Sequence, residues 1–100
     1  MSVLMTMKVE GDPEKLVALA KENPQRLSDI AADGKSHGAI HHAFYANGST
    51  VFVVDEWPDE ASFHSFFEAN GEIPQVMADA GVTAQPEVTF YRKLDTGDDF

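Results

Sequence analysis

Cysteine is absent from this chain of 100 residues, and basic residues are scarce. Without cysteine, neither disulfide bonds nor thiolate metal sites can form. Seven lysine and arginine residues stand against 17 aspartate and glutamate residues, which gives a formal net charge of −10. Because this charge repels phosphate backbones and anionic lipid headgroups, we expect neither nucleic acid nor a membrane surface as a partner.

Targeting signals and nucleotide-binding motifs are also missing. The N-terminal sequence has only a short apolar stretch with no basic region before it, so we expect a cytoplasmic protein without a signal peptide or membrane span. No glycine-rich phosphate loop, dinucleotide fingerprint or nucleophile-elbow serine occurs. Nucleotide cofactors and hydrolysis by a serine triad are therefore not expected.

The strongest local signal is Asn47-Gly48, which lies between two runs of β-branched and aromatic residues. Both residues tolerate positive φ, so the pair predicts a β-hairpin with strands near 37–46 and 49–56. Both faces of this hairpin carry mostly apolar side chains. A hairpin of this kind must be covered on both faces.

The N-terminal part of the chain predicts a strand followed by helix. Apolar residues alternate over residues 3–10, which indicates a half-buried strand. Asp12 and Pro13 are typical of a helix start. Pro24 interrupts the helical pattern, which predicts a break near it, and Gly34 is the expected C-terminal cap.

After the hairpin, the sequence Pro-Asp-Glu at 58–60 predicts the start of a second helix. Its buried face is marked by three aromatic residues at helical spacing, Phe63, Phe66 and Phe67. A further short helix is expected to end at Gly81. Residues 87–94 predict the last strand, and 95–100 an acidic, flexible tail.

The predicted order β-α-β-β-α-β indicates an α+β, ferredoxin-like domain over residues 1–94. Its four-stranded antiparallel sheet would carry the helices on one face and leave the other face bare. Burying a few hundred Å² of apolar surface contributes several kcal/mol at roughly 25 cal/mol per Å². An uncovered patch of that size usually marks an interface, so we expect a homodimer in which sheet packs on sheet.

The element order, the D-E-W at 55–57 and the W-P-D-E-A-S-F-H-S-F-F at 57–67 resemble the dimeric α/β-barrel superfamily. Within it, the likeness is to the antibiotic-biosynthesis-monooxygenase-like domains. The resemblance implies a ferredoxin-like subunit, a tight homodimer and a pocket between helices and sheet. Such domains include cofactor-free oxygenases acting on polycyclic aromatics and haem-degrading enzymes. Haem-degrading relatives carry a histidine near the position that Met77 occupies in this chain. Because Met77 stands there instead, no cofactor is expected.

His42 and Asp55 are the candidate catalytic residues. The predicted register sets His42 across from Val53, with Asp55 as a diagonal neighbour on the same face. A buried carboxylate would orient the imidazole, which would act as a general base on an acidic phenol or activated carbon. Two alternatives stay open: the couple could be purely structural, or His41 and Glu56 on the opposite face could line the pocket instead.

The expected substrate-binding residues are mostly aromatic: Phe44, Tyr45, Trp57, Phe66, Phe67 and Met77. Tyr45 or Tyr91 could donate a hydrogen bond to a developing oxyanion. No metal site is expected, because His37 and His41 would lie about 13 Å apart along one strand at ~3.3 Å per residue.

Together with the resemblance, these features predict a small-molecule enzyme of the cofactor-independent monooxygenase or cyclase type. Its substrate would be aromatic or polyketide-like and would bind between the sheet and the helices. The alternative is a non-catalytic homodimer that binds a hydrophobic small molecule or serves as an accessory to other proteins.

Overall fold

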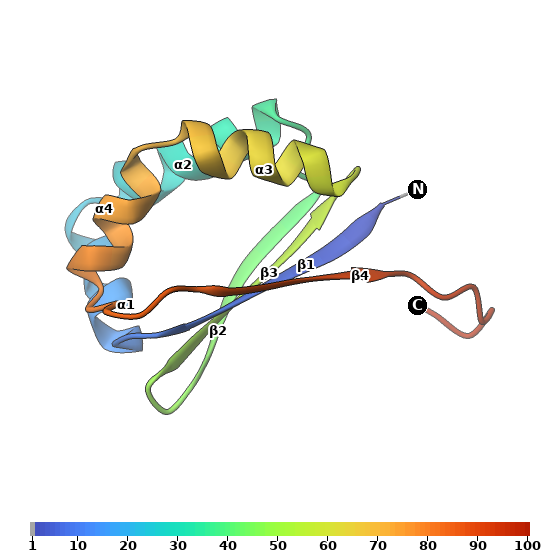
Figure 1. Ribbon diagram of the computed structural model, residues 1–100. Coiled ribbons are helices and arrows are strands. Elements are labelled where there is room, and N and C mark those ends of the chain that lie inside the picture. The colour runs from blue at the N-terminus through green and yellow to red at the C-terminus, as the bar shows by residue number, and fades with distance from the viewer. Residues whose placement is uncertain (1) are drawn as a thin grey trace.

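The computed structural model describes residues 2–100, and it shows one sheet with helices over one of its faces (Figure 1). The elements follow in the order β1 (Val3–Glu10), α1 (Pro13–Glu22), α2 (Pro24–Ser36), β2 (His41–Asn47), β3 (Thr50–Trp57), α3 (Glu60–Ala69), α4 (Glu72–Asp79) and β4 (Glu87–Arg92). All neighbouring strands are antiparallel, in the order β2-β3-β1-β4. The predicted α+β, ferredoxin-like fold is confirmed.

The C-terminal residues leave the sheet beyond β4. This strand ends at Arg92, two residues before the predicted end, and the remaining chain extends away from the body (Figure 1). Lys93 Nζ pairs with Asp99 Oδ2 at 2.7 Å. The flexibility of 95–100 and the domain boundary at residue 94 stay predictions, and Met1 lies outside the described residues. No helix within residues 2–100 is long and apolar enough to cross a membrane.

The predicted break at Pro24 is confirmed, because α1 ends at Glu22 and α2 begins at Pro24 itself. The prediction that Gly34 ends the helix is wrong. Gly34 lies buried inside α2, where a Cβ atom would lie 3.7 Å from the Phe66 ring, and the chain turns instead at Gly38 with φ +105°. The first hairpin strand therefore begins only at His41 rather than near residue 37.

The hairpin is present, but its turn is Gly48-Ser49 rather than Asn47-Gly48. Gly48 has φ +59°, and among residues 2–100 only glycines have positive φ. This is the pattern of a type II′ turn, which has glycine at its first central position. Asn47 pairs with Thr50, which moves the pairing by two residues along β3. Because side chains alternate with a period of two, the predicted faces are unchanged.

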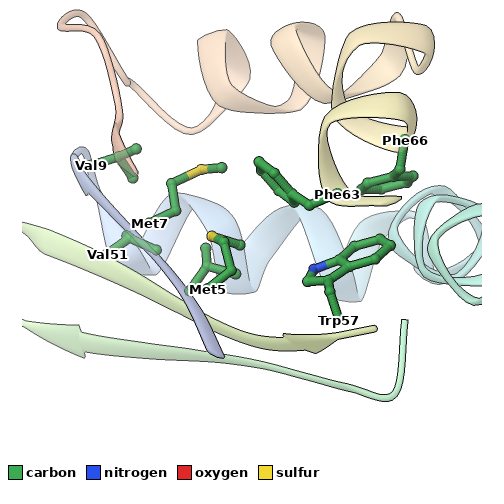
Figure 2. Packing of buried hydrophobic residues seen from close by; sticks show 8 residues of the cluster. Met5, Met7, Val9, Val51, Trp57, Phe63 and Phe66 are labelled. Atoms are coloured by element: carbon green, nitrogen blue, oxygen red, sulfur yellow. The ribbon is translucent and has the colours of Figure 1, made fainter. Parts of the chain in front are cut away.

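The core lies between the sheet and the helices (Figure 2). Its largest fully buried side chains are Trp57, Phe63 and Met5. The Trp57 ring packs against Phe63 at 5.7 Å and against Phe66 at 5.4 Å between centroids. Aromatic contacts at such distances add to the stabilisation from burial. The indole is therefore held in one position at the end of β3.

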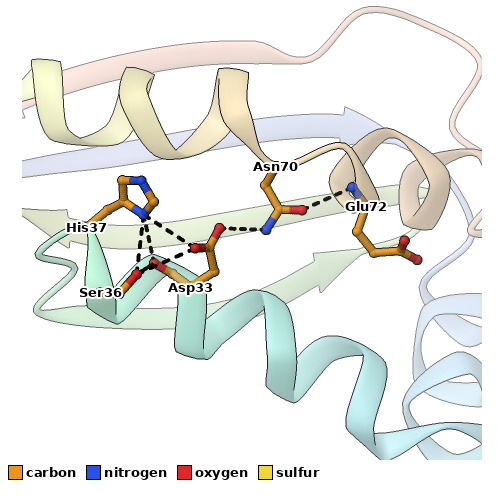
Figure 3. Close-up of polar contacts among 5 residues, drawn as sticks. All are labelled: Asp33, Ser36, His37, Asn70 and Glu72. Atoms are coloured by element: carbon orange, nitrogen blue, oxygen red, sulfur yellow. Dashed lines mark hydrogen bonds and ion pairs between the residues drawn. The ribbon is translucent and has the colours of Figure 1, made fainter.

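The junction between α3 and α4 is tied to α2 by polar contacts (Figure 3). Asn70 Nδ2 donates to Asp33 Oδ2 at 2.8 Å, and Asn70 Oδ1 accepts from the backbone N–H of Glu72 at 3.0 Å. The His37 ring, at the end of α2, has its Nδ1 2.9 Å from the Asp33 carbonyl oxygen. These bonds fix the helical layer above the sheet.

Arg26 makes a second link between α2 and α4. Its Nε lies 2.8 Å from Glu72 Oε1, and its Nη1 lies 2.8 Å from Asp79 Oδ2. The two carboxylates lie at opposite ends of α4, so one guanidinium forms ion pairs with both ends of this short helix. The link sets how α4 presents its inner side chains to the sheet.

Asp59 caps α3, and its contribution to the stability of the folded protein should depend on pH. Its Oδ1 accepts from the hydroxyl and the backbone N–H of Ser62, both at 2.8 Å, and these hydrogen bonds lower the pKa of Asp59 below its ordinary 3.8. Because the folded pKa is the lower one, the stabilisation is present above about pH 4 and is lost as the pH falls through the folded value.

We therefore predict that Asp59→Ala lowers Tm at neutral pH and that its difference from the wild type disappears in acid. Calorimetric scans between neutral pH and pH about 2.5 would measure it. Asp95→Ala, a carboxylate beyond β4, is the matched control and should leave Tm unchanged. A Tm difference for Asp59→Ala that persists undiminished in acid would contradict the capping role.

Candidate functional site

A cavity with a free volume of about 130 Å³ lies between the sheet and the helices. Within residues 2–100, the only ionisable side chains that line it are His42 and Asp55. The rest of the lining is apolar or aromatic, and much of it comes from Met5, Met7, Val53, Trp57, Ile30, Phe63, Phe66, Ile73 and Met77. A largely apolar pocket with a few convergent polar groups is typical of small-molecule sites.

At the polar end of the cavity, hydrogen bonds connect three side chains from β2 and β3. His42 stands directly across from Asp55, not across from Val53 as predicted. Its Nδ1 lies 2.7 Å from Asp55 Oδ1, and the indole Nε1–H of Trp57 donates to Asp55 Oδ2 at 3.2 Å. Asp55 is 5% exposed, whereas the His42 side chain is 39% exposed on the edge strand. These hydrogen bonds thus link the buried carboxylate to an imidazole that is partly exposed to solvent.

This arrangement sets the tautomer of the imidazole. An ionised carboxylate only accepts hydrogen bonds, so the contact with Asp55 requires the hydrogen on His42 Nδ1. A neutral ring then keeps its lone pair on Nε2. The site can therefore accept a proton at one ring nitrogen while the carboxylate stabilises the resulting imidazolium.

Five of the six predicted substrate-binding residues line the cavity: Phe44, Trp57, Phe66, Phe67 and Met77. Tyr45 does not, because the alternation along β2 places it on the face away from the helices, opposite Phe52. Tyr91 pairs with Leu4 on that same outer face. Neither tyrosine can reach an oxyanion inside the cavity of its own subunit.

The alternative couple lies on the outer face. His41 pairs with Glu56, and the Glu56 carboxylate accepts a hydrogen bond from the Ser2 hydroxyl. Neither residue lines the cavity. Across residues 2–100, no three histidine, aspartate or glutamate side chains are grouped so that they could hold a metal ion.

Several wall residues were not among the predicted site residues. They come from α1, α2 and α4 and include Leu16, Leu27, Ile30, Ile73 and Val76. Their helical spacing was visible in the sequence and could have identified them as facing the sheet. The bond from Trp57 to Asp55 also has a sequence signal, since residues two apart on a strand share a face.

No family model matches the chain, and a search of curated proteins found no match to its sequence. Solved structures do match over nearly the whole length. SnoaB, a cofactor-independent oxygenase from Streptomyces nogalater, is 17% identical with a TM-score of 0.64, and the match covers 98% of each chain. An antibiotic biosynthesis monooxygenase is 11% identical with a TM-score of 0.65, over 93% of this chain and 99% of the other.

A third match is NE2512 from Nitrosomonas europaea, a protein of unknown function, with 21% identity, 96% of each chain covered and a TM-score of 0.59. At such identities the likeness is one of fold. This chain therefore shares its fold with SnoaB and with an antibiotic biosynthesis monooxygenase, the fold that the resemblance in its sequence implied.

Proposed function

We propose that this protein is a small-molecule enzyme of the cofactor-independent monooxygenase type. The observation that carries the proposal is that, within residues 2–100, one imidazole–carboxylate couple, His42 and Asp55, supplies all the ionisable groups lining an otherwise apolar cavity. In the proposed reaction, His42 removes the hydroxyl proton of an aromatic or polyketide-like substrate. Positioned bases of this kind contribute about 10²–10⁴-fold to rate.

The reaction needs no external reductant. Deprotonation gives an electron-rich phenolate that can pass electrons to O₂, after which a carbon–oxygen bond forms at the para carbon. A phenol with a free para position and one O₂ then give a para-quinone and one water, so atoms and electrons balance. The apolar walls would exclude bulk water from the phenolate while this occurs.

The comparisons support the reaction type in a limited way. SnoaB is a cofactor-independent oxygenase with this fold, although it shares only 17% identity with this chain. Since fold alone does not fix function, the proposal stands on the couple in the cavity rather than on the neighbour.

We also propose that the working form is a homodimer. The outer face of the sheet has no cover from the helices, and among polar residues such as Thr6, Lys8 and Glu56 it carries a patch of apolar and aromatic side chains. Leu4 is 41% exposed there, Tyr45 56% and Tyr91 52%. Phe52 and Val54 lie between them on β3. An exposed apolar patch of this kind favours packing against the same patch of a second copy, related by a two-fold axis.

Oxygen uptake with 1-naphthol tests the proposed enzyme. We expect consumption of one O₂ per 1,4-naphthoquinone formed, without added cofactor, together with a rise in Tm on binding. A rise in Tm without O₂ uptake would favour the alternative, a non-catalytic protein that binds small molecules in the same cavity. An unchanged Tm and no uptake would contradict both functions.

A further inference from the structure

We infer that the cavity selects ligands that donate a hydrogen bond, and that Trp57 is the positioning residue behind this selectivity. The inference rests on the proposed use of the cavity as a ligand site, but it does not require turnover. It assigns Trp57 a role through its N–H group, beyond that of an aromatic wall. The chemical class of ligand that follows is an apolar molecule with a single hydroxyl, a phenol or enol.

The polar side-chain atoms around the cavity are almost all engaged. Asp55 Oδ1 is taken by His42 Nδ1 at 2.7 Å, and Asp55 Oδ2 is taken by Trp57 Nε1 at 3.2 Å. Each Asp55 oxygen keeps one further lone pair, and the methionine sulfurs are weak acceptors. Within residues 2–100, the one other lining side-chain atom left to pair with a ligand is His42 Nε2. With the hydrogen on Nδ1, that atom is an acceptor.

Trp57 holds this arrangement because its own ring cannot turn. It is 1% exposed and is packed against Phe63 and Phe66. Its N–H therefore points at Oδ2 of Asp55 and keeps the other carboxylate oxygen aimed at His42. Without the N–H, Oδ2 would be buried and unpaired, which costs free energy. Rotation of the carboxylate would then become favourable.

A site that offers acceptors but no free side-chain donor discriminates between closely similar ligands. A hydroxyl pairs with Nε2, whereas a methyl ether of the same ring leaves Nε2 desolvated and unpaired, which lowers affinity by about tenfold. A carboxylate finds no donor at all and lies near the Asp55 charge. We therefore expect phenols to bind, ethers to bind weakly and carboxylates not to bind.

The ¹⁵N NMR spectrum of the histidine rings tests the positioning role directly. In the wild type, His42 at neutral charge should show hydrogen on Nδ1 and a lone pair on Nε2. In Trp57→Phe, which keeps an aromatic ring but removes the N–H, the ring should show a mixture of both tautomers. Hydrogen on Nε2 in the wild type, or the same single tautomer in a folded Trp57→Phe, would overturn the inference.

Calorimetric titration with 1-naphthol, 1-methoxynaphthalene and 1-naphthoate tests the ligand class. The wild type should bind the naphthol about tenfold more tightly than the ether, and Trp57→Phe should lose most of this preference. Equal binding of naphthol and ether by the wild type, or binding of neither, would overturn the inference. If the preference holds but no O₂ is consumed, only the proposed catalysis fails.

Discussion

Replacing His42 with alanine should lower the rate of naphthol oxidation by about 10²–10⁴-fold, the usual contribution of a positioned general base. The reason is that, within residues 2–100, the only other ionisable side chain lining the cavity is Asp55, whose carboxylate stays bonded to the Trp57 N–H. The His42 side chain is 39% exposed, so its removal takes nothing from the apolar core, although it leaves Asp55 Oδ1 without its partner. Initial rates of O₂ uptake at saturating naphthol would measure it.

The matched control is His41→Ala, one residue away on the same strand and on the opposite face. It removes an identical ring without touching the cavity, so turnover should stay close to that of the wild type. Turnover in His42→Ala equal to that of His41→Ala would rule out the proposed base. Circular dichroism of both variants would verify that each is folded.

Replacing Val54 with lysine should convert the homodimer into monomers. Val54 lies on β3 between Ala43 and Thr6, near the centre of the outer sheet face. In a symmetric dimer the substitution buries two ammonium groups, and each costs several kcal/mol without a partner. Because the net charge falls from −10 to −9, greater overall repulsion between subunits cannot explain dissociation.

Val17→Lys is the matched control, because Val17 is 53% exposed on α1, away from the sheet. Sedimentation velocity at micromolar concentrations should show dimers for the wild type and this control, and monomers for Val54→Lys. A monomeric wild type, or a Val54→Lys protein that remains dimeric, would show that the outer face is not the interface.

The hairpin illustrates what local sequence can and cannot predict. Asn47-Gly48 indicated a tight turn, and the turn is there, displaced by one residue to Gly48-Ser49. Both loops contain Gly48 and have two residues, so turn propensity alone could not separate them. The displacement changes pairing by two residues and leaves the faces intact. Sequence therefore predicted that His42 and Asp55 share a face, but not that they stand directly across from each other.

The errors around α2 have a tertiary cause. Gly34 has the local signature of a helix end, but α2 continues past it and lies against α3 there, with room for a Cβ atom at 3.7 Å from the Phe66 ring. His37 consequently belongs to the end of α2 and contacts Asp33, rather than starting β2. Both residues lie near the Phe66 ring of α3, which is distant in sequence, and tertiary contacts of this kind override local propensity.

Only part of the candidate site could be predicted from the sequence. The alternation along β2 and β3 put His42, Asp55 and Trp57 on one face, but the sharing of the carboxylate between an imidazole and an indole depends on rotamers. Those rotamers are set by packing of Trp57 against α3. The catalytic role of the couple and the homodimer stay predictions.

The most direct test of the central claim is a titration of ¹³C-methyl-methionine-labelled protein with 1-naphthol, followed by NMR. Met5, Met7 and Met77 line the cavity from the sheet and from α4. We predict that the methyl signals of all three shift together and saturate at one ligand per subunit. Methyl signals of all three that stay in place with naphthol in large excess would contradict a ligand site between the sheet and the helices.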